Sequence, residues 1–263
     1  MELSDKLDND IGLTEKYKAY ATEELKKPIE ERWDPPATSK MASEFYGTCK
    51  NKIAIVAGSG PSLQRVKDQL RFLSDDFVVI SVNGAIQDVR SDFWLFIDYD
   101  AYTRWGSCEN AASAKRLGVD RFWPTYDPET YIWRRSYNEK QVTEGGRLFH
   151  QNTSLLAAIH FAFKLGCRLV ITVGADLHIK PGKVFDKELV DRHGGYDNYI
   201  QIMNFTFVRI ILSLQKTLEK WKDPEATLVD ASWGLMPCPK VDLATVIKKV
   251  KERSDGGLIG IAN

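Results

Sequence analysis

The hydrophobic residues of this chain gather in short continuous runs, and amphipathic stretches separate the runs from one another. Runs that are apolar throughout, rather than at every second position, are typical of strands buried on both faces of a parallel sheet. Such runs occupy residues 53–57, 76–83, 92–98, 168–174 and 226–232, with a shorter one at 120–124. Apolar residues at helical spacing predict helices over residues 62–73, 108–117, 153–166, 199–221 and 242–252.

This alternation of strands and helices predicts one α/β domain. Strands joined by helices run parallel, and the helices cover both faces of the sheet. We therefore expect a doubly wound, mostly parallel, Rossmann-like sheet in a single nucleotide-binding catalytic domain over residues 51–263. Residues 1–50 are charged and helical in pattern until Asp34-Pro35-Pro36 interrupts them, which predicts a helical N-terminal arm. The pattern is compatible with an arm packed on the domain and with one that contacts another copy in a homo-oligomer.

A glycine-rich turn, Gly-Ser-Gly-Pro-Ser at residues 58–62, follows the first predicted strand. Backbone N–H groups at such a strand-to-helix turn favour phosphate binding. The turn lacks the lysine of a Walker loop, and Leu63 stands where the dinucleotide fingerprint has its third glycine. At the end of the second strand, where the dinucleotide fingerprint has an acid that binds ribose, this chain has Asn83. The asparagine amide both donates and accepts hydrogen bonds. The pattern favours a mononucleotide site, with a tight turn that holds no ligand as the alternative.

Further polar residues fall where predicted strands end, which is where parallel sheets bind ligands. The full set of candidate donor-binding residues is Gly58, Ser59, Gly60, Pro61, Ser62, Asn83, Asp98, Thr153, Ser154, Gly174 and Asp176. Thr153 and Ser154 open a predicted helix, where their hydroxyls either cap the helix or meet a phosphate. Asp98 and Asp100 follow the third strand, where a divalent-metal site competes with ordinary turn and cap roles.

The four histidines differ in the surroundings that the sequence gives them. His160 lies inside an apolar helix, so we expect a core role for it. His150 precedes the Thr-Ser helix start and His178 follows Asp176, so either is placed to line the site. His193 lies in a polar, glycine-containing loop before the helix at 199–221. A histidine of ordinary pKa there is suited to act as a general base, and a plain surface histidine is the alternative.

Composition narrows the classes of function. Lys+Arg and Asp+Glu both number 36, and this balance argues against a strongly basic nucleic-acid binder, although nucleic acid stays open as an acceptor. No apolar run approaches the roughly 20 residues that span a bilayer. The first ten residues are acidic and polar and predict no signal peptide, and the four scattered cysteines form no CxxC pair. These features predict a cytoplasmic protein with reduced thiols.

Three stretches carry a resemblance to known proteins: AGSGPSL, VNGA and NTSLLAAIHFAFKLGCRLVITVGADL. From about Lys52 to Leu243 the chain resembles two related groups. One is the bacterial sialyltransferases that build lipooligosaccharide ends. The other comprises proteins similar to archaeal 6-hydroxymethylpterin pyrophosphokinases and to flagellin-modifying motility accessory factors.

The sialyltransferase resemblance implies roles for individual residues. In that family the glycine turn, the following asparagine and the Thr-Ser helix start hold the CMP part of the donor, and a histidine before a late helix is the base. The implied donor-binding residues here are Gly58, Gly60, Pro61, Ser62, Asn83, Thr153 and Ser154. The implied base is His193.

The chain also departs from the sialyltransferase pattern. Where those enzymes have tyrosines that steady the departing phosphate, this chain has His178, Lys180 and Lys183. Leu155 replaces the glycine after Thr-Ser, and Ser59 replaces an asparagine. A cationic loop would suit the leaving diphosphate of a UDP- or GDP-sugar. The strand end that contains Asp98 and Asp100 is closer to the pyrophosphokinase-like group, whose acids would hold Mg²⁺ on ATP.

These observations support three hypotheses. The first is a glycosyltransferase that moves a sugar from a nucleotide-activated donor to a hydroxyl of a glycan, a protein or a hydroxymethylated DNA base. This reaction requires no cofactor, although it is compatible with Mg²⁺. His193 and His178 would be catalytic, and Lys180 and Lys183 would stabilise the leaving phosphate. The second is a Mg²⁺- and ATP-dependent pyrophosphokinase. The third is a nucleotide-binding or assembly protein without catalysis. We interpret the aromatic and basic segment 122–135 as a surface insertion. Its rings either pack on the rest of the protein or stack on a ring of the acceptor.

Overall fold

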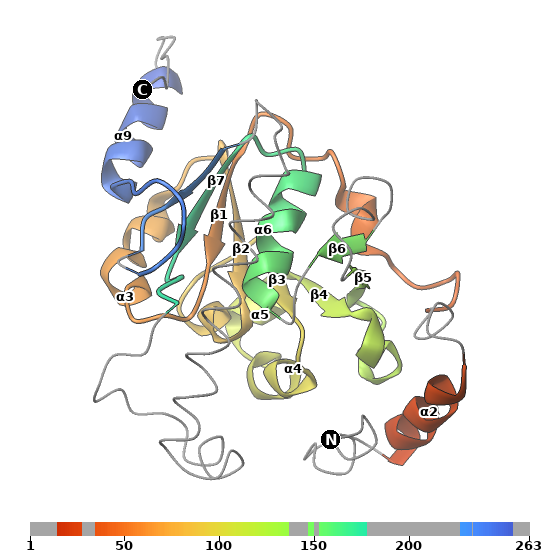
Figure 1. Cartoon of the computed structure of the whole chain (residues 1–263). Coiled ribbons are helices and arrows are strands. Elements are labelled where there is room, and N and C mark those ends of the chain that lie inside the picture. The colour runs from red at the N-terminus through yellow and green to blue at the C-terminus, as the bar shows by residue number, and fades with distance from the viewer. Residues whose placement is uncertain are drawn as a thin grey trace.

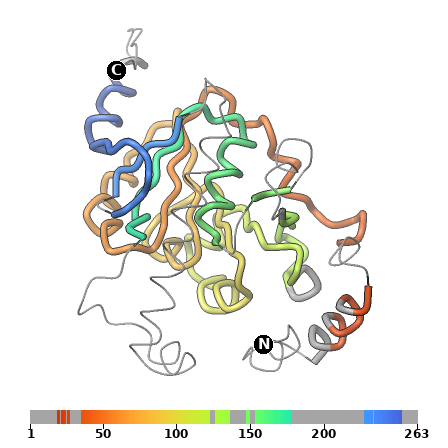
Figure 2. The backbone as a smooth tube through the Cα atoms, viewed as in Figure 1, coloured from red at the N-terminus to blue at the C-terminus, as the bar shows by residue number. Residues whose placement is uncertain are grey.

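The computed structural model contains a single parallel sheet that dominates the described part of the chain (Figure 1). The described residues are 15–27, 35–136, 147–149, 153–177, 227–232 and 234–254, and Figure 2 traces the backbone. The strands are β1 (Ile53–Ala57), β2 (Phe77–Val82), β3 (Phe93–Phe96), β4 (Lys115–Val119), β5 (Tyr131–Ser136), β6 (Arg147–Phe149), β7 (Leu169–Val173) and β8 (Thr227–Asp230). Their order is β6-β5-β4-β3-β2-β1-β7-β8 and each neighbouring pair is parallel, which confirms the expected α/β fold class.

The strand order reverses once, between β1 and β7. From β1 the chain builds the sheet outward through β2 to β6, and it then returns to place β7 on the other side of β1. At such a reversal the loops that leave the two neighbouring strands diverge to opposite faces, and the crevice between them is the preferred ligand site of open α/β sheets. The carboxyl ends of β1 and β7 therefore mark the place to search for a functional site.

Helices cover both faces of the sheet, as the alternation predicted. On one face, α6 (Ser154–Lys164) packs its buried apolar residues over β1, β2 and β3, as seen at the centre of Figure 1. On the other face, α3 (Leu63–Val66), the 3₁₀ helix η2 (Gln69–Phe72) and α9 (Leu243–Ser254) share a second apolar cluster with β1 and β7. The predicted helix over 62–73 is thus two short helices.

A smaller apolar cluster lies at the carboxyl end of β3. It joins Trp94 and Phe96 of that strand to the 3₁₀ helix η3 (Asn83–Gln87) and to the short helices α4 (Tyr99–Trp105) and α5 (Glu109–Ser113).

The prediction for the middle of the chain was wrong in two places. Residues 120–124 belong to the 3₁₀ helix η4 (Asp120–Thr125), and the strand before it is β4, whose charged start resembled the end of a helix. Segment 122–135 is not a surface insertion, because residues 131–135 belong to β5, which lies between β4 and β6 in the sheet, and Trp133 is fully buried. The rings of Phe122, Tyr126 and Tyr131 also pack on protein groups, as in the edge-to-face contact of Tyr126 with Tyr102. The predicted helix over 199–221 lies outside the described residues.

The last ten residues of the predicted arm pack into the main core. The 3₁₀ helix η1 (Ala42–Phe45) buries Ala42 completely, and the Phe45 ring meets the Tyr131 ring at 4.6 Å between centroids. The Ile132 N–H donates to the Lys40 carbonyl at 2.8 Å, which attaches this segment to β5. Nearer the N-terminus, the described part of the arm is the helix α2 (Glu15–Lys26). Within the described part of the chain, no helix has the length and apolar character that crossing a membrane requires.

Candidate functional site

The glycine turn after β1 is hydrogen-bonded to the end of β7, directly at the reversal of strand order. The Gly58 N–H donates to the Val173 carbonyl and the Gly60 N–H donates to the Gly174 carbonyl, each at 2.8 Å. The Ser62 N–H donates to Asp176 Oδ2, also at 2.8 Å. The structure thus brings together two groups of predicted site residues that lie more than 100 positions apart in the sequence.

The glycines of this site allow two backbones to approach each other closely. A Cβ added to Gly60 would lie 2.4 Å from Asp176 Oδ2, and one added to Gly58 would lie 2.7 Å from the Gly174 carbonyl oxygen. Gly174 has a φ of +62°, which side chains rarely adopt. Packing between the two strand ends is therefore sufficient to require all three glycines. Their presence in the sequence does not need a ligand to explain it.

Protein acceptors engage three of the four backbone N–H groups of the 58–62 turn, those of Gly58, Gly60 and Ser62. Besides the three bonds to β7 and its end, the Leu63 N–H donates to the Gly60 carbonyl at 3.0 Å, and Pro61 has no N–H. The Asp176 carboxylate, only 5% exposed, occupies the anion-binding position that such a turn normally offers to a ligand. The Ser62 hydroxyl is buried, and no described group hydrogen-bonds to it. The turn therefore offers a ligand mainly its side chains, because most of its backbone N–H groups already have protein acceptors.

A buried polar network behind the site holds the end of β7 in place. Fully buried Asp230, at the end of β8, accepts hydrogen bonds from the Thr172 hydroxyl at 2.6 Å and the Ser232 N–H at 3.0 Å, and it pairs with the Lys240 ammonium. The Ser232 hydroxyl in turn accepts from the Ala175 N–H at 2.8 Å. A charged group is tolerated in such a place when its hydrogen bonds are satisfied, and a satisfied network makes its surroundings rigid. Sequence reasoning missed these residues.

Asn83 and Ser154 form a second pair of predicted site residues that the fold brings together. Asn83 follows β2 with a φ of +48°, a conformation that asparagine tolerates, and its backbone oxygen accepts from the Trp94 indole at 3.0 Å. Its side-chain Oδ1 accepts from the Ser154 hydroxyl at 3.2 Å. Thr153 caps α6, because its hydroxyl accepts from the Leu155 N–H at 3.2 Å. Capping is therefore an observed role of Thr153, whereas Ser154 faces the second strand end.

The two acids after β3 lie at the start of α4. Asp98 is exposed and has the extended backbone of an N-cap residue, although its side chain makes no capping bond, and Asp100 is half-buried in the first turn. Within the described part of the chain, no three side chains of His, Cys, Asp or Glu gather closely enough to suggest a metal site. The role of Asp98 and Asp100 as metal ligands stays a prediction.

His160 has the core role that its position in the helix predicted. It is buried, and its Nδ1 accepts a hydrogen bond from the Phe149 N–H at 2.9 Å, which ties β6 to α6. Burial, reinforced by the Lys164 charge, lowers the pKa of His160 to about 3, so the imidazole is neutral. The other residues with predicted chemical roles lie outside the described residues, and those roles stay predictions. They are His150, His178, Lys180, Lys183 and His193.

Comparison with known proteins gives a fold relationship. No protein-family model matches the chain, and no curated protein matches it. Among solved structures, the chain is similar to the MAf glycosyltransferase from Magnetospirillum magneticum AMB-1, with a TM-score of 0.52 and 16% identity over 82% of this chain. The chain spans about 40% of the length of that protein. This likeness confirms the fold that the sequence resemblance implied.

A second similar structure is the sialyltransferase CstII from Campylobacter jejuni in complex with the substrate analogue CMP-3FNeuAc. The TM-score is 0.39 and the identity 16%, over 68% of this chain and 80% of that one.

Proposed function

We propose that this chain is a glycosyltransferase that moves a sugar from a nucleotide-activated donor to an acceptor hydroxyl. The observation that carries the proposal is a pair of contacts at neighbouring strand ends. The 58–62 turn meets Asp176 at the reversal of strand order, and Asn83 meets Ser154 at the end of the adjacent strand β2. Open α/β sheets bind nucleotides at this position. The fold shared with a protein described as a glycosyltransferase supports the reaction class.

The side chains at the site suit the nucleoside part of the donor. A carboxylate accepts hydrogen bonds from ribose hydroxyls, and the Asp176 carboxylate is already held in one orientation by the Ser62 N–H. The Asn83 amide both donates and accepts, so it can match a base edge or a sugar hydroxyl. The buried Ser62 hydroxyl adds a group whose hydrogen bond a ligand would complete. Pre-oriented polar groups of this kind reduce the ordering cost of binding.

Transfer itself would use residues of the 177–198 segment. The acceptor oxygen attacks the anomeric carbon, the bond from that carbon to the phosphate oxygen breaks, and the acceptor proton passes to His193. The nucleotide leaves with the bonding electron pair, and His178, Lys180 and Lys183 offset its negative charge.

A Mg²⁺-dependent pyrophosphokinase is the second candidate function. The observation that favours it is the placement of Asp98 and Asp100 at the start of α4, directly beyond the carboxyl end of β3. In that reaction the attacking hydroxyl would release its proton and take the diphosphoryl group of ATP, and AMP would leave with the bonding electron pair. Asp98 and Asp100 would hold the Mg²⁺ that offsets the phosphate charge.

Turnover of defined donors distinguishes the candidates. Full-length protein is incubated with CMP-, UDP- and GDP-sugars in EDTA, with glycan, peptide and hydroxymethylated DNA acceptors, and transferred sugar is measured. We expect transfer from one donor class in EDTA, and we expect His193→Ala to abolish transfer while nucleotide affinity is kept. ATP-dependent diphosphate transfer that EDTA stops and Asp98→Asn abolishes would instead establish the pyrophosphokinase. Nucleotide binding without any turnover would favour a non-catalytic protein.

A further inference from the structure

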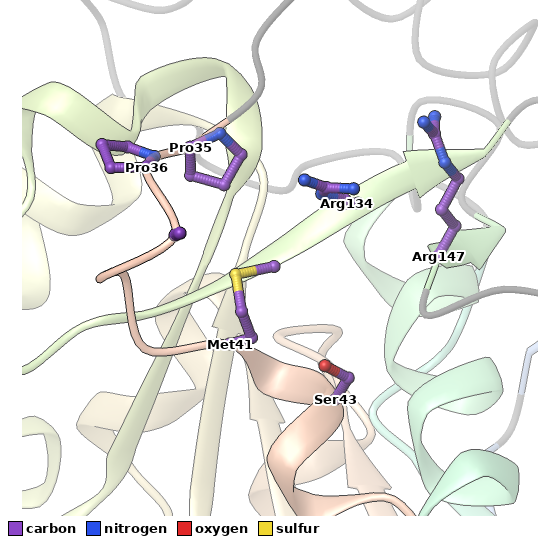
Figure 3. A pocket seen from close by; sticks show the side chains of 7 residues that line it. Pro35, Pro36, Met41, Ser43, Arg134 and Arg147 are labelled. Carbon is purple, nitrogen blue, oxygen red and sulfur yellow. The ribbon is translucent and has the colours of Figure 1, made fainter.

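Two pockets, each of about 380 Å³, lie outside the candidate site. The first is at the β5–β6 edge of the sheet, with Pro35 and Pro36 on one side and Arg134 and Arg147 on the other (Figure 3). The second, the η2–α9 pocket, lies between η2 and α9 on the face of the sheet that α3 also covers. It has the more apolar lining, which consists of Gln69, Phe72, Ala244, Ile247, Lys248, Lys251 and Glu252.

The apolar part of the η2–α9 pocket combines a buried floor with an exposed ring. Ile247 of α9 is only 9% exposed, because it also belongs to the apolar cluster beneath the pocket. Phe72 of η2 is 71% exposed, whereas Leu70, two residues earlier, is buried in the same cluster. A single exposed ring is ordinary on a protein surface, but an exposed ring at the side of an apolar pocket offers a partner continuous apolar area to bury.

The rim of the pocket carries charges of both signs. Among the described residues, no acid pairs with Lys251. Glu252 approaches Lys248 only at 3.8 Å, and the two side chains are 57% and 78% exposed. An exposed pair at this distance contributes little, so the Glu252 carboxylate stays available to a second cation. The rim therefore offers a partner one cation and one anion.

Gln69 adds a polar group that lacks a partner. Its side-chain oxygen is buried, and no described group donates a hydrogen bond to it. A buried acceptor without a donor lowers stability, and a donor supplied by another molecule would remove that cost.

A second copy of the same surface matches these features. At an interface with a two-fold axis, if one residue meets another across the axis, the reverse contact is made as well. Such an axis beside the pocket sets the Phe72 ring of each copy against the apolar floor of the other, and Lys251 beside the partner's Glu252. A uniformly anionic partner, such as nucleic acid or an acidic membrane, would instead face Glu252 with its own sign of charge. The chain has 36 basic and 36 acidic residues, so two copies do not repel each other at long range.

We propose that the η2–α9 pocket is the interface of a homodimer, in which Phe72 of each copy enters the pocket of the other and Lys251 pairs with the partner's Glu252. None of the lining residues belongs to the candidate site, and the proposal does not depend on glycosyl transfer. Because the pocket is small, we expect the dimer at the weak end of specific interfaces.

Sedimentation-velocity ultracentrifugation of the full-length chain measures the dissociation constant of the dimer over roughly 1–200 µM, where small interfaces associate. We expect a concentration-dependent dimer that Phe72→Ser weakens at least tenfold, because buried aromatic side chains dominate interface affinity. Leu235→Ser is the matched control, since Leu235 is also an exposed large apolar residue but does not line the pocket. It should leave the dissociation constant unchanged.

A charge exchange tests the predicted ion pair. Lys251→Glu should weaken the dimer about tenfold, because the two-fold axis replaces two attractive contacts with two repulsive ones. Glu252→Lys alone should have a similar effect, and the double variant Lys251→Glu/Glu252→Lys should return the affinity to within about threefold of the unaltered protein. Lys249→Glu changes an exposed lysine of α9 that does not line the pocket, and it should have no effect.

Three results would overturn the interface: monomer at every concentration, a dimer that Phe72→Ser leaves intact, or a double variant no tighter than the single ones. Monomer throughout would assign the pocket to another occupant, either a different protein or another segment of this chain. Unaltered protein gives an independent readout, because hydrogen exchange of residues 69–72 and 244–252 should slow as the protein concentration rises. Exchange that does not change with concentration would also reject the proposal.

Discussion

The β1–β7–β8 strand ends and the β5–β6 edge arrange charged side chains in opposite ways. At the strand ends, each acid described above is matched by protein donors, as when Asp176 accepts the Ser62 N–H and Asp230 pairs with Lys240. At the β5–β6 edge, the register places Arg134 beside Arg147 at the wall of an open pocket. The first arrangement fixes hydrogen-bonding side chains in position for an uncharged part of a ligand. The second places two like charges on neighbouring strand positions, which opposes the pairing of those strands.

The largest effect should come from breaking the network at the strand ends. Asp230→Ala removes the acceptor of Thr172 and Ser232 and leaves the Lys240 ammonium without its carboxylate. We expect it to lower the free energy of unfolding by about 3–5 kcal/mol, because two buried donors lose their acceptor at about 1–3 kcal/mol each. Urea unfolding followed by circular dichroism measures this. Asp68→Ala, at an exposed position, is the control and should change little. A loss below about 1 kcal/mol for Asp230→Ala would mean that the network contributes little.

Gly60→Ala tests the close approach of the turn to β7. The added methyl would meet Asp176 Oδ2 at 2.4 Å and the Gly174 carbonyl oxygen at 2.5 Å, so the strand ends must separate. We expect a loss of about 2–3 kcal/mol, typical of overpacking. Thermal unfolding compares it with Ser59→Ala, an exposed neighbour in the same turn. Equal stability of the two variants would show that the turn relaxes without strain.

His160, which ties β6 to α6, should make stability depend on pH. Its pKa falls from 6.5 to about 3 on folding, so between those values the unfolded chain binds a proton that the native chain does not. The stabilisation is therefore complete above pH 6.5 and decreases by about 1.4 kcal/mol per pH unit as the pH falls toward 3. Unfolding curves from pH 7 to pH 4 should show this slope, and His160→Gln should reduce it by that amount. Identical slopes in the two proteins would argue against a neutral, buried His160.

The smallest effect is expected at the β5–β6 edge. Arg147→Gln removes one of two like charges on neighbouring strands, a contact that costs on the order of 0.2–1 kcal/mol. The free energy of unfolding should stay unchanged or rise by up to about 0.5 kcal/mol in phosphate-free buffer. Chemical unfolding in that buffer gives the value. A loss above about 2 kcal/mol would show that Arg147 is a structural group, and the contrast between the two regions would fail.

The sequence predicted those strands that are buried on both faces. β1, β2, β3 and β7 are continuous apolar runs, so their pattern alone identifies them. β4 and β5 carry lysine and arginine side chains within the strand, and such residues also suit helices and loops. Their assignment depends on the tertiary contacts of Leu117 and Trp133, which no local pattern contains.

Some residues of the candidate site were likewise predictable from the sequence, and others were not. Gly58, Asn83 and Asp176 stood out because each follows a recognisable strand, and the fold joins the turn that begins at Gly58 to Asp176 and joins Asn83 to Ser154. The pairing of Lys240 with Asp230 was not predictable, since it requires the chain after β8 to turn back onto that strand. The Arg134–Arg147 wall depends on strand register, which two short strands at the edge of a sheet do not specify by pattern.

The most direct test of the central claim is the affinity of the β1, β2 and β7 strand ends for nucleotides. CMP, UDP and GDP are titrated against unaltered protein, Ser154→Ala, and the matched control Ser113→Ala, whose serine lies at the exposed end of α5. Ser154 donates to Asn83, and loss of one such hydrogen bond is worth about 1 kcal/mol. We predict that at least one nucleotide binds, about fivefold more weakly to Ser154→Ala and equally well to Ser113→Ala. Failure of all three nucleotides to bind, or equal affinity in both variants, would contradict the assignment of a nucleotide site to these strand ends.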